Sequence, residues 1–177
     1  FVGPLNERKN IPGLLKAFSI LAKKGIQYRL VITGTGKETY INLIKKLCMG
    51  LNIQDKVSWT GKIPSDAMVY FYNNAELLVY PSLYEGFGYP PLEAMACGCP
   101  IVASNTTSIP EVVGNAGILF NPHDTEEMAQ AIEKVLKDTD LRQDLIKKGF
   151  EQVKNFSWAK TAKETLEVYK KVYNFKK

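Results

Sequence analysis

Residues 80 to 100 read Tyr80-Pro-Ser-Leu-Tyr-Glu-Gly-Phe-Gly-Tyr-Pro-Pro-Leu-Glu-Ala-Met-Ala-Cys-Gly-Cys-Pro100, and they combine a glycine-rich turn, two carboxylates and a helix start. It lies between two apolar runs of strand length, Leu77–Tyr80 and Ile101–Ser104. The pair Pro90-Pro91 suits the first turn of a helix, where the missing N–H is not needed, and Gly98 suits the left-handed position after the last turn. The stretch therefore predicts a strand, a loop, a helix over about 90–97 and a second strand.

The loop and the helix start bring two carboxylates close to several backbone amides. Glu85 precedes the Gly86-Phe-Gly88 turn, and Glu93 is predicted to lie in the first helical turn. Backbone amides without partners at a helix start favour an anion. A solvated loop position would explain Glu85 alone, and helix capping would explain Glu93 alone. The pair of acids, separated by seven residues with two glycines between them, is more specific than either acid alone.

Strand-length and helix-length segments alternate along the rest of the chain. Strands are expected at 1–3, 28–33, 57–60, 77–80, 101–104 and 117–120, and helices at 11–24, from after 37 to 50, after 64, at 90–97, 109–113, 124–137, 140–154 and 157–173. This alternation predicts a parallel sheet covered on both faces, because each crossover returns the chain in the same direction. The expected fold is an α/β, Rossmann-like three-layer domain that binds ligands at the carboxyl ends of its strands.

Several polar residues are expected to cap these helices. Asn10 and Ser157 are good N-caps, Ser65 can cap the helix after residue 64, and Asp124 with Glu127 has the spacing of a capping box. The last helix is expected to bury one stripe of side chains, made of Trp158, Ala162, Thr165, Leu166 and Tyr169.

Composition narrows the range of possible functions. The net charge is +5, but the lysines are scattered over predicted helices, so we expect solvated helix faces and no nucleic-acid binding. The three cysteines form no C-x-x-C pair, and Asp138-Thr-Asp140 fits a helix stop and N-cap better than a metal motif, so no metal is expected. No apolar run approaches the length of a membrane span. A cytoplasmic location is expected, with peripheral association with the cytoplasmic face of a membrane as a possibility.

The two acids carry a resemblance to a known family. The segment from Glu85 to Glu93, with Gly-Phe-Gly between them and Glu-Ala-Met-Ala-Cys-Gly-Cys-Pro from Glu93 onward, resembles the E-x7-E signature of retaining GT-B glycosyltransferases of the glycogen-synthase and sucrose-synthase-like group. The resemblance covers nearly all of residues 1–177. It implies the C-terminal, nucleotide-sugar-binding half of a GT-B fold, without the N-terminal acceptor domain against which the last helix would pack.

The resemblance also implies roles for individual residues. Glu85 would approach the donor sugar, and Glu93 would accept hydrogen bonds from the ribose hydroxyls. The amides of the turn between them would bind sugar and phosphate. The implied donor-binding residues in this segment are Glu93, Gly86, Phe87, Gly88 and Tyr89, with Glu85 as a catalytic residue.

The first loop departs from the family pattern. Family members usually have Gly-Arg a few residues before a Lys, and both basic side chains hold the diphosphate of the donor. In this chain Gly3 is followed by Pro4, so the arginine is missing from its usual place. Lys9 matches the family lysine and is expected to act in catalysis. Arg8 is equally consistent with a partial substitute for the missing arginine and with a solvated side chain.

The remaining glycine-rich loops give weaker indications. Gly34 and Gly36 invite a dinucleotide-binding interpretation, but Thr39 occupies the place of the third glycine, and a tight turn explains both glycines about as well. By resemblance, Gly34 and Gly36 lie beside the nucleotide, and Ile63 is expected to line the base.

The expected function is transfer of a glycosyl group from a nucleotide-diphosphate sugar to an acceptor, with retention of anomeric configuration and without cofactor or metal. The acceptor, a saccharide, a lipid-linked molecule or another compound, is not identified by the sequence. The isolated chain is expected to be inactive or weakly active. Two alternatives remain open: a binding module for nucleotide sugars or phosphates that does not catalyse, and a sugar-nucleotide epimerase.

Overall fold

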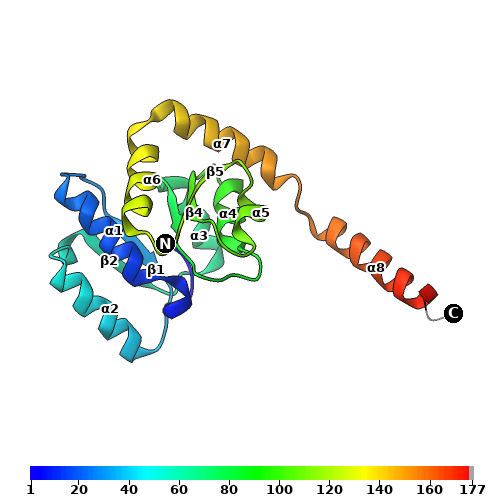
Figure 1. Ribbon diagram of the computed structural model, residues 1–177, viewed down its shortest axis with the longest axis horizontal. Helices are drawn as coiled ribbons and strands as arrows, with labels where there is room; N and C mark the ends of the chain where they lie inside the picture. Colours follow the sequence, from blue (N-terminus) through cyan, green and yellow to red (C-terminus); the bar gives the residue numbers. More distant parts are fainter. Residues whose placement is uncertain (176–177) are drawn as a thin grey trace.

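In the computed structural model, which describes residues 1–175, strands and helices alternate in the predicted order (Figure 1). The strands are β1 (Leu30–Thr33), β2 (Val57–Gly61), β3 (Leu78–Tyr80), β4 (Ile101–Ser104) and β5 (Gly117–Phe120). The helices are η1 (Glu7–Lys9), α1 (Ile11–Lys23), α2 (Glu38–Gly50), η2 (Gln54–Lys56), α3 (Ser65–Asn74), α4 (Tyr89–Ala96), α5 (Ile109–Val113), α6 (Thr125–Lys137), α7 (Thr139–Val153) and α8 (Trp158–Phe175).

The strands form two parallel groups. β1 pairs with β2, and β4 lies between β3 and β5. The strand expected at residues 1–3 is reduced to isolated parallel bridges, Val2 with Thr33 and Leu5 with Gly36. Pro4 interrupts this segment because it has no N–H to donate to a ladder. Among the described residues every strand pairing is parallel, as predicted.

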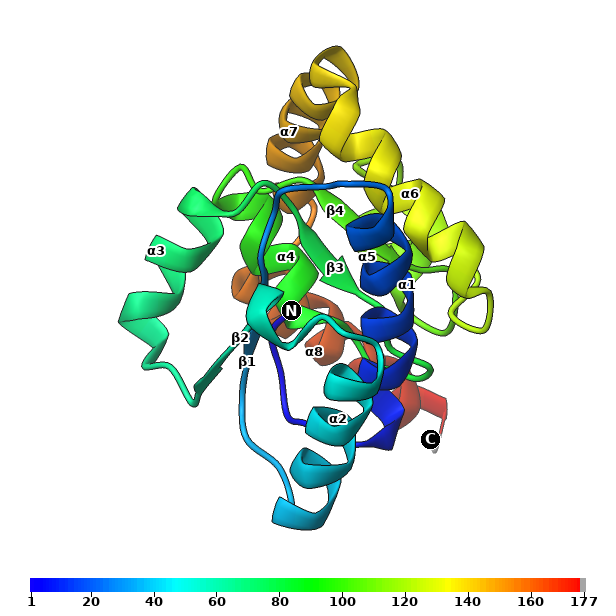
Figure 2. The ribbon, with the colours of Figure 1, turned by 90° about the vertical axis from the view of Figure 1, so that its left-hand side faces the viewer.

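Side chains alternate across β3 and β4, and this alternation creates a separate core on each face of the sheet. Val79 and Val102 pack in one core with residues of α1 and α6. Tyr80 and Ile101 point the other way, into a core with residues of α4 and α5. Figure 2 shows α1 and α6 on one side of β3 and β4, and α3 and α4 on the other. The three-layer α/β prediction is therefore confirmed.

Most predicted caps are present at the helix starts. Asn10 accepts a hydrogen bond from the amide of Gly13 at 3.3 Å, and Ser157 accepts one from the amide of Lys160 at 3.1 Å. Asp138 ends α6 and caps α7, as expected for a helix stop and N-cap.

Two capping predictions need correction. Ser65 is the first residue of α3, the N-cap is Pro64, and no side chain caps this helix. Asp124 caps α6 by accepting from the amide of Glu127 at 2.9 Å, but the Glu127 carboxylate accepts from the amide of Asn121 at 3.1 Å. Only half of the capping box is therefore formed, because the chain before α6 folds back and offers Glu127 a different amide.

The last helix differs most from expectation. We predicted a buried stripe on it, but α8 contains no buried residue, and the side chain of Trp158 is 76% exposed. Figure 1 shows why: α8 extends away from the rest of the molecule, so its apolar side chains stay largely exposed. A bilayer-spanning helix, which needs both length and apolar character, is absent from residues 1–175.

Candidate functional site

A buried ion pair joins the first loop to the loop after β3. The Lys9 ammonium donates to Glu85 Oε1 at 2.6 Å and to the Tyr80 hydroxyl at 2.8 Å. It also lies 4.8 Å from the centre of the Tyr80 ring. Lys9 is 3% exposed and Glu85 9%. Two residues that were each predicted to act in catalysis are thus in direct contact, although Lys9 is engaged with Glu85 and not open to solvent.

The protonation states of this cluster follow from its contacts. Burial acts to raise the pKa of the Glu85 carboxyl, but several hydrogen bonds, the one from Lys9 foremost, together with the charge of Lys9 outweigh it, so the pKa lies below its usual value. Burial and the Glu85 charge raise the pKa of Tyr80. At neutral pH the cluster therefore holds a carboxylate and a neutral phenol.

The turn after Glu85 has its carbonyls bound and its amides free. The Ser108 hydroxyl lies within hydrogen-bond distance of two carbonyl oxygens, that of Glu85 at 3.0 Å and that of Phe87 at 2.8 Å, and donates to them. Within residues 1–175, the amides of Gly86, Phe87 and Gly88 donate no hydrogen bond. These three donors directly precede α4, whose amino end also favours negative charge. The local geometry is suited to an anion.

Thr107 supports the same turn and has a strained backbone conformation. Its hydroxyl accepts a hydrogen bond from the amide of Glu85 at 3.1 Å. Its φ of 54° lies in the left-handed region, which is a genuine outlier for a β-branched residue. Strain of this kind clusters at functional sites. This role had no direct signal in the sequence, apart from several hydroxyl residues at the carboxyl end of β4.

The second acid occupies a different environment. Glu93 is the fifth residue of α4 and is exposed, so it does not lie in the first turn as predicted and does not cap the helix. Its Oε2 accepts a hydrogen bond from the hydroxyl of Tyr72, on α3, at 3.0 Å. The structure therefore contradicts the capping explanation of Glu93, and it identifies a partner that sequence reasoning missed.

Aromatic contacts connect this segment to the start of α8. The ring of Phe87 lies 4.9 Å from that of Tyr89 and 5.8 Å from that of Phe156, measured between centroids. Tyr89 in turn stacks on Trp158 at 6.3 Å. The two aromatic residues predicted to bind the donor are thus held by rings that follow α7.

Close backbone packing explains the glycines of the second loop. A Cβ atom on Gly34 would lie 1.9 Å from the carbonyl oxygen of Gly3, and one on Gly36 would lie 2.0 Å from that of Leu5. Only glycine can occupy these positions without moving the chain. Gly34 also donates its amide to the carbonyl of Gly61 at 2.7 Å, two residues before the half-buried Ile63. The three predicted loops therefore meet along one edge.

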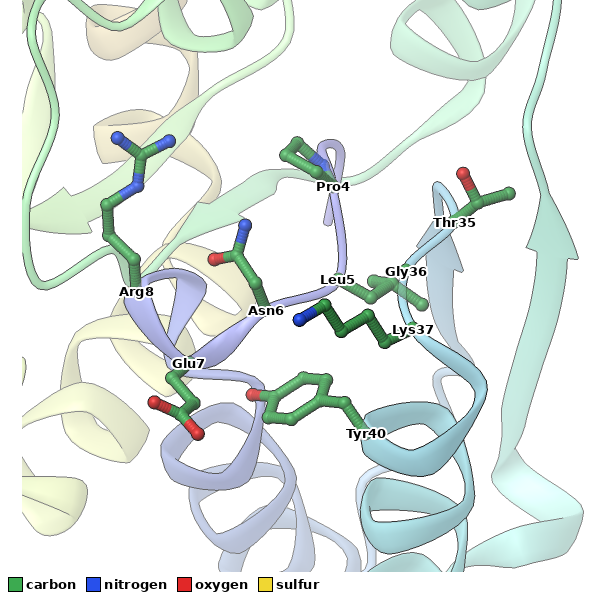
Figure 3. Close-up of a pocket in the computed structure, with 9 residues that line it drawn as sticks. All are labelled: Pro4, Leu5, Asn6, Glu7, Arg8, Thr35, Gly36, Lys37 and Tyr40. Carbon is green, nitrogen blue, oxygen red and sulfur yellow. The ribbon is translucent and has the colours of Figure 1, made fainter.

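A cavity of about 560 Å³ opens between the first two loops (Figure 3). In Figure 3 the Lys37 side chain extends toward Asn6, whereas the Arg8 guanidinium points away from Tyr40. Arg8 and Lys9 thus diverge: Arg8 lines this open cavity, and Lys9 is buried against Glu85. The cavity is lined by Pro4, Leu5, Asn6, Glu7, Arg8, Thr35, Gly36, Lys37 and Tyr40. Residues 1–175 contain no cluster of three or more His, Cys, Asp or Glu side chains able to hold a metal ion.

Comparison with known proteins places the chain in a family. Residues 1–152 match the model of the family described as Glycosyl transferases group 1. The chain belongs to this family. Its curated relatives include the O-antigen chain mannosyltransferase B of Escherichia coli, which is 38% identical over 172 residues, covering 96% of this chain and 45% of the relative. The family resemblance inferred from the two acids is therefore confirmed.

Solved structures agree on the GT-B fold. Sucrose-phosphate synthase from Thermosynechococcus elongatus superposes with a TM-score of 0.86 at 30% identity, over 98% of this chain and 44% of that protein. Anabaena HepE, solved in complex with UDP, superposes with a TM-score of 0.84 at 20% identity, over 96% of this group 1 chain and 46% of HepE. The chain spans less than half the length of each of these relatives.

Proposed function

We propose that this group 1 chain is the donor-binding half of a glycosyltransferase that uses a nucleotide-diphosphate sugar. The observation that carries the proposal is the row of free amides at Gly86, Phe87 and Gly88, placed between Glu85 and Glu93 at the start of α4. Diphosphate is the anion that such a row suits. The UDP in the Anabaena neighbour and the mannosyltransferase name of the E. coli relative support a donor of this class.

The proposed reaction breaks the bond between the anomeric carbon and the donor phosphate oxygen. Negative charge then develops on the departing diphosphate, and positive charge develops at the anomeric carbon. The loop amides and Lys9 would stabilise the diphosphate, as fixed donors do wherever charge builds up in a transition state. Glu85, bound to Lys9, would lie beside the donor sugar, and Glu93 would accept hydrogen bonds from the ribose. The nearby positions of Gly3, Gly34, Gly36 and Ile63 are consistent with a donor that extends along the same edge.

We further propose that the reaction retains anomeric configuration and needs no metal. Departure of the diphosphate and entry of the acceptor would take place on one face of the sugar. The acceptor would bind in a part of the enzyme beyond these residues, so the chain alone would bind donor but transfer poorly.

Donor binding is tested by thermal unfolding with uridine, guanosine and adenosine diphosphates and with their glucose and mannose derivatives. A ligand that binds the folded state raises its melting temperature. We expect at least one sugar nucleotide to do so, and phosphate alone at equal concentration to do so less. If no nucleotide changes the melting temperature, the proposal is wrong.

Catalysis is tested with the longer enzyme that contains this chain, supplied with donor and saccharide acceptors. A transferase forms a glycosylated product only when acceptor is present. An epimerase changes the donor sugar without acceptor, and a binding module leaves the donor intact in both cases. Proton NMR of the product's anomeric centre decides between retention and inversion.

A further inference from the structure

The two oxygens of the Glu93 carboxylate differ in their contacts. Oε2 accepts a hydrogen bond from the Tyr72 hydroxyl at 3.0 Å, and within residues 1–175 Oε1 has no recorded partner. Glu93 is exposed, whereas Tyr72 is only 4% exposed. The carboxylate therefore has one oxygen attached to the protein interior and one oxygen free for a ligand.

Tyr72 is well suited to fix a side chain in one orientation. Its ring belongs to the same buried core as Leu78 and Ile101, and α3 packs directly against α4. A glutamate on an exposed helix turn samples several rotamers, and ordering such a side chain on binding costs conformational entropy. A hydrogen bond from a rigid donor reduces that cost before the ligand arrives.

A phenol also leaves the charge of Glu93 available. Burial and the Glu93 carboxylate raise the pKa of Tyr72, so its hydroxyl stays protonated and continues to donate at neutral pH. An ionised carboxylate has about four lone-pair sites, and Tyr72 uses one of them. A lysine in this place would neutralise the acid, as Lys9 does at Glu85. The neutral donor therefore keeps Glu93 a strong acceptor for two neighbouring hydroxyls.

We propose that Tyr72 is a positioning residue that holds Glu93 in the orientation that accepts both ribose hydroxyls of a bound nucleotide. Tyr72 touches neither the nucleotide nor the reacting atoms and acts through Glu93. This inference rests on the proposed function, because it needs a nucleotide at Glu93. It adds a residue of α3, 21 positions before Glu93, to the donor site.

The experiment compares Tyr72→Phe with wild type on two probes: the nucleoside diphosphate that stabilises the wild-type chain most, and its 2′,3′-dideoxy analogue. Isothermal titration measures both dissociation constants. We expect Tyr72→Phe to weaken binding of the ribonucleotide by about tenfold and to leave binding of the dideoxy analogue unchanged. Adding Tyr72→Phe to Glu93→Ala should cause no further loss. Tyr70→Phe is the matched control, because Tyr70 lies on the same helix but is 68% exposed.

The alternatives give different results. An equal loss of affinity for both probes would mean that the hydroxyl supports the site in general. No loss of affinity for either probe would mean that Glu93 needs no anchor. Each of these results overturns the inference but leaves the proposed function standing. A Tyr72→Phe chain that does not fold would make the hydroxyl a structural requirement and would also overturn it. If the wild-type chain binds no nucleotide, the proposed function fails together with the inference.

Discussion

The two acids on either side of the free amides, Glu85 and Glu93, are held in opposite ways. Glu85 is buried, and a charged partner, Lys9, neutralises it. Glu93, eight positions later, is exposed and receives a hydrogen bond from a neutral phenol. A buried acid needs a counter-charge because desolvation penalises an isolated ion, whereas an exposed acid needs only orientation. Substitutions at the first acid's partner should therefore act mainly on stability, and substitutions at the second acid mainly on binding.

The largest expected effect is that of Lys9→Met, which removes the cation that pairs with Glu85. Breaking a buried pair leaves an uncompensated charge, so we expect the free energy of unfolding at pH 7 to fall by about 3–5 kcal/mol. Urea denaturation followed by circular dichroism measures this change. Lys37→Met is the control: Lys37 is exposed, and we expect a change within about 0.5 kcal/mol.

The dependence of that loss on pH identifies its cause. The pKa of Glu85 in the folded chain lies below the ordinary value of 4.5. The stability contributed by the pair is therefore fully present above about pH 4.5 and is lost as the pH falls through the folded-state pKa. Wild type and Lys9→Met should converge in stability at acidic pH. A gap that stays constant from pH 7 to pH 3 would mean that Lys9 acts through packing and not through charge.

Glu93→Ala should show the reverse pattern. We expect nucleotide binding to weaken by about 1–3 kcal/mol, because a charged hydrogen-bond acceptor for the ribose is lost. Stability should change by less than about 1 kcal/mol, since water can replace the exposed carboxylate beside Tyr72. Calorimetric titration and thermal unfolding measure the two effects, with Glu164→Ala on α8 as the control. A collapse in melting temperature with unchanged affinity would refute the contrast between the two acids.

Ser108→Ala tests the turn between the acids and has the smallest expected effect. It removes the hydroxyl proton that is shared between the carbonyls of Glu85 and Phe87, and we expect a loss of about 1–2 kcal/mol in stability. Nucleotide affinity should fall several-fold as the free amides lose their alignment. Ser65→Ala is matched to it, because Ser65 is an exposed serine that caps no helix. Equal behaviour of the two variants in unfolding and titration would exclude a role for Ser108.

Local sequence signals predicted the elements and the acids but not their partners. The apolar period and the Pro and Gly positions gave β3, α4 and β4 to within about two residues, because these signals act over short distances. The Lys9–Glu85 contact joins residues 76 positions apart, and only the folded sheet brings them together. Tyr72 and Thr107 were missed for the same reason, since a hydroxyl's partner depends on packing. The buried stripe predicted on α8 was wrong because periodicity indicates an apolar face but not what covers it.

The stacked rings of Tyr89 and Trp158 connect α8 to the amino end of α4. Tyr89 is the first residue of α4 and Trp158 is the first residue of α8. One ring pair therefore joins the amino ends of these two helices. The ring pair places the first residue of α8 against the residue that directly follows the free amides of Gly86, Phe87 and Gly88.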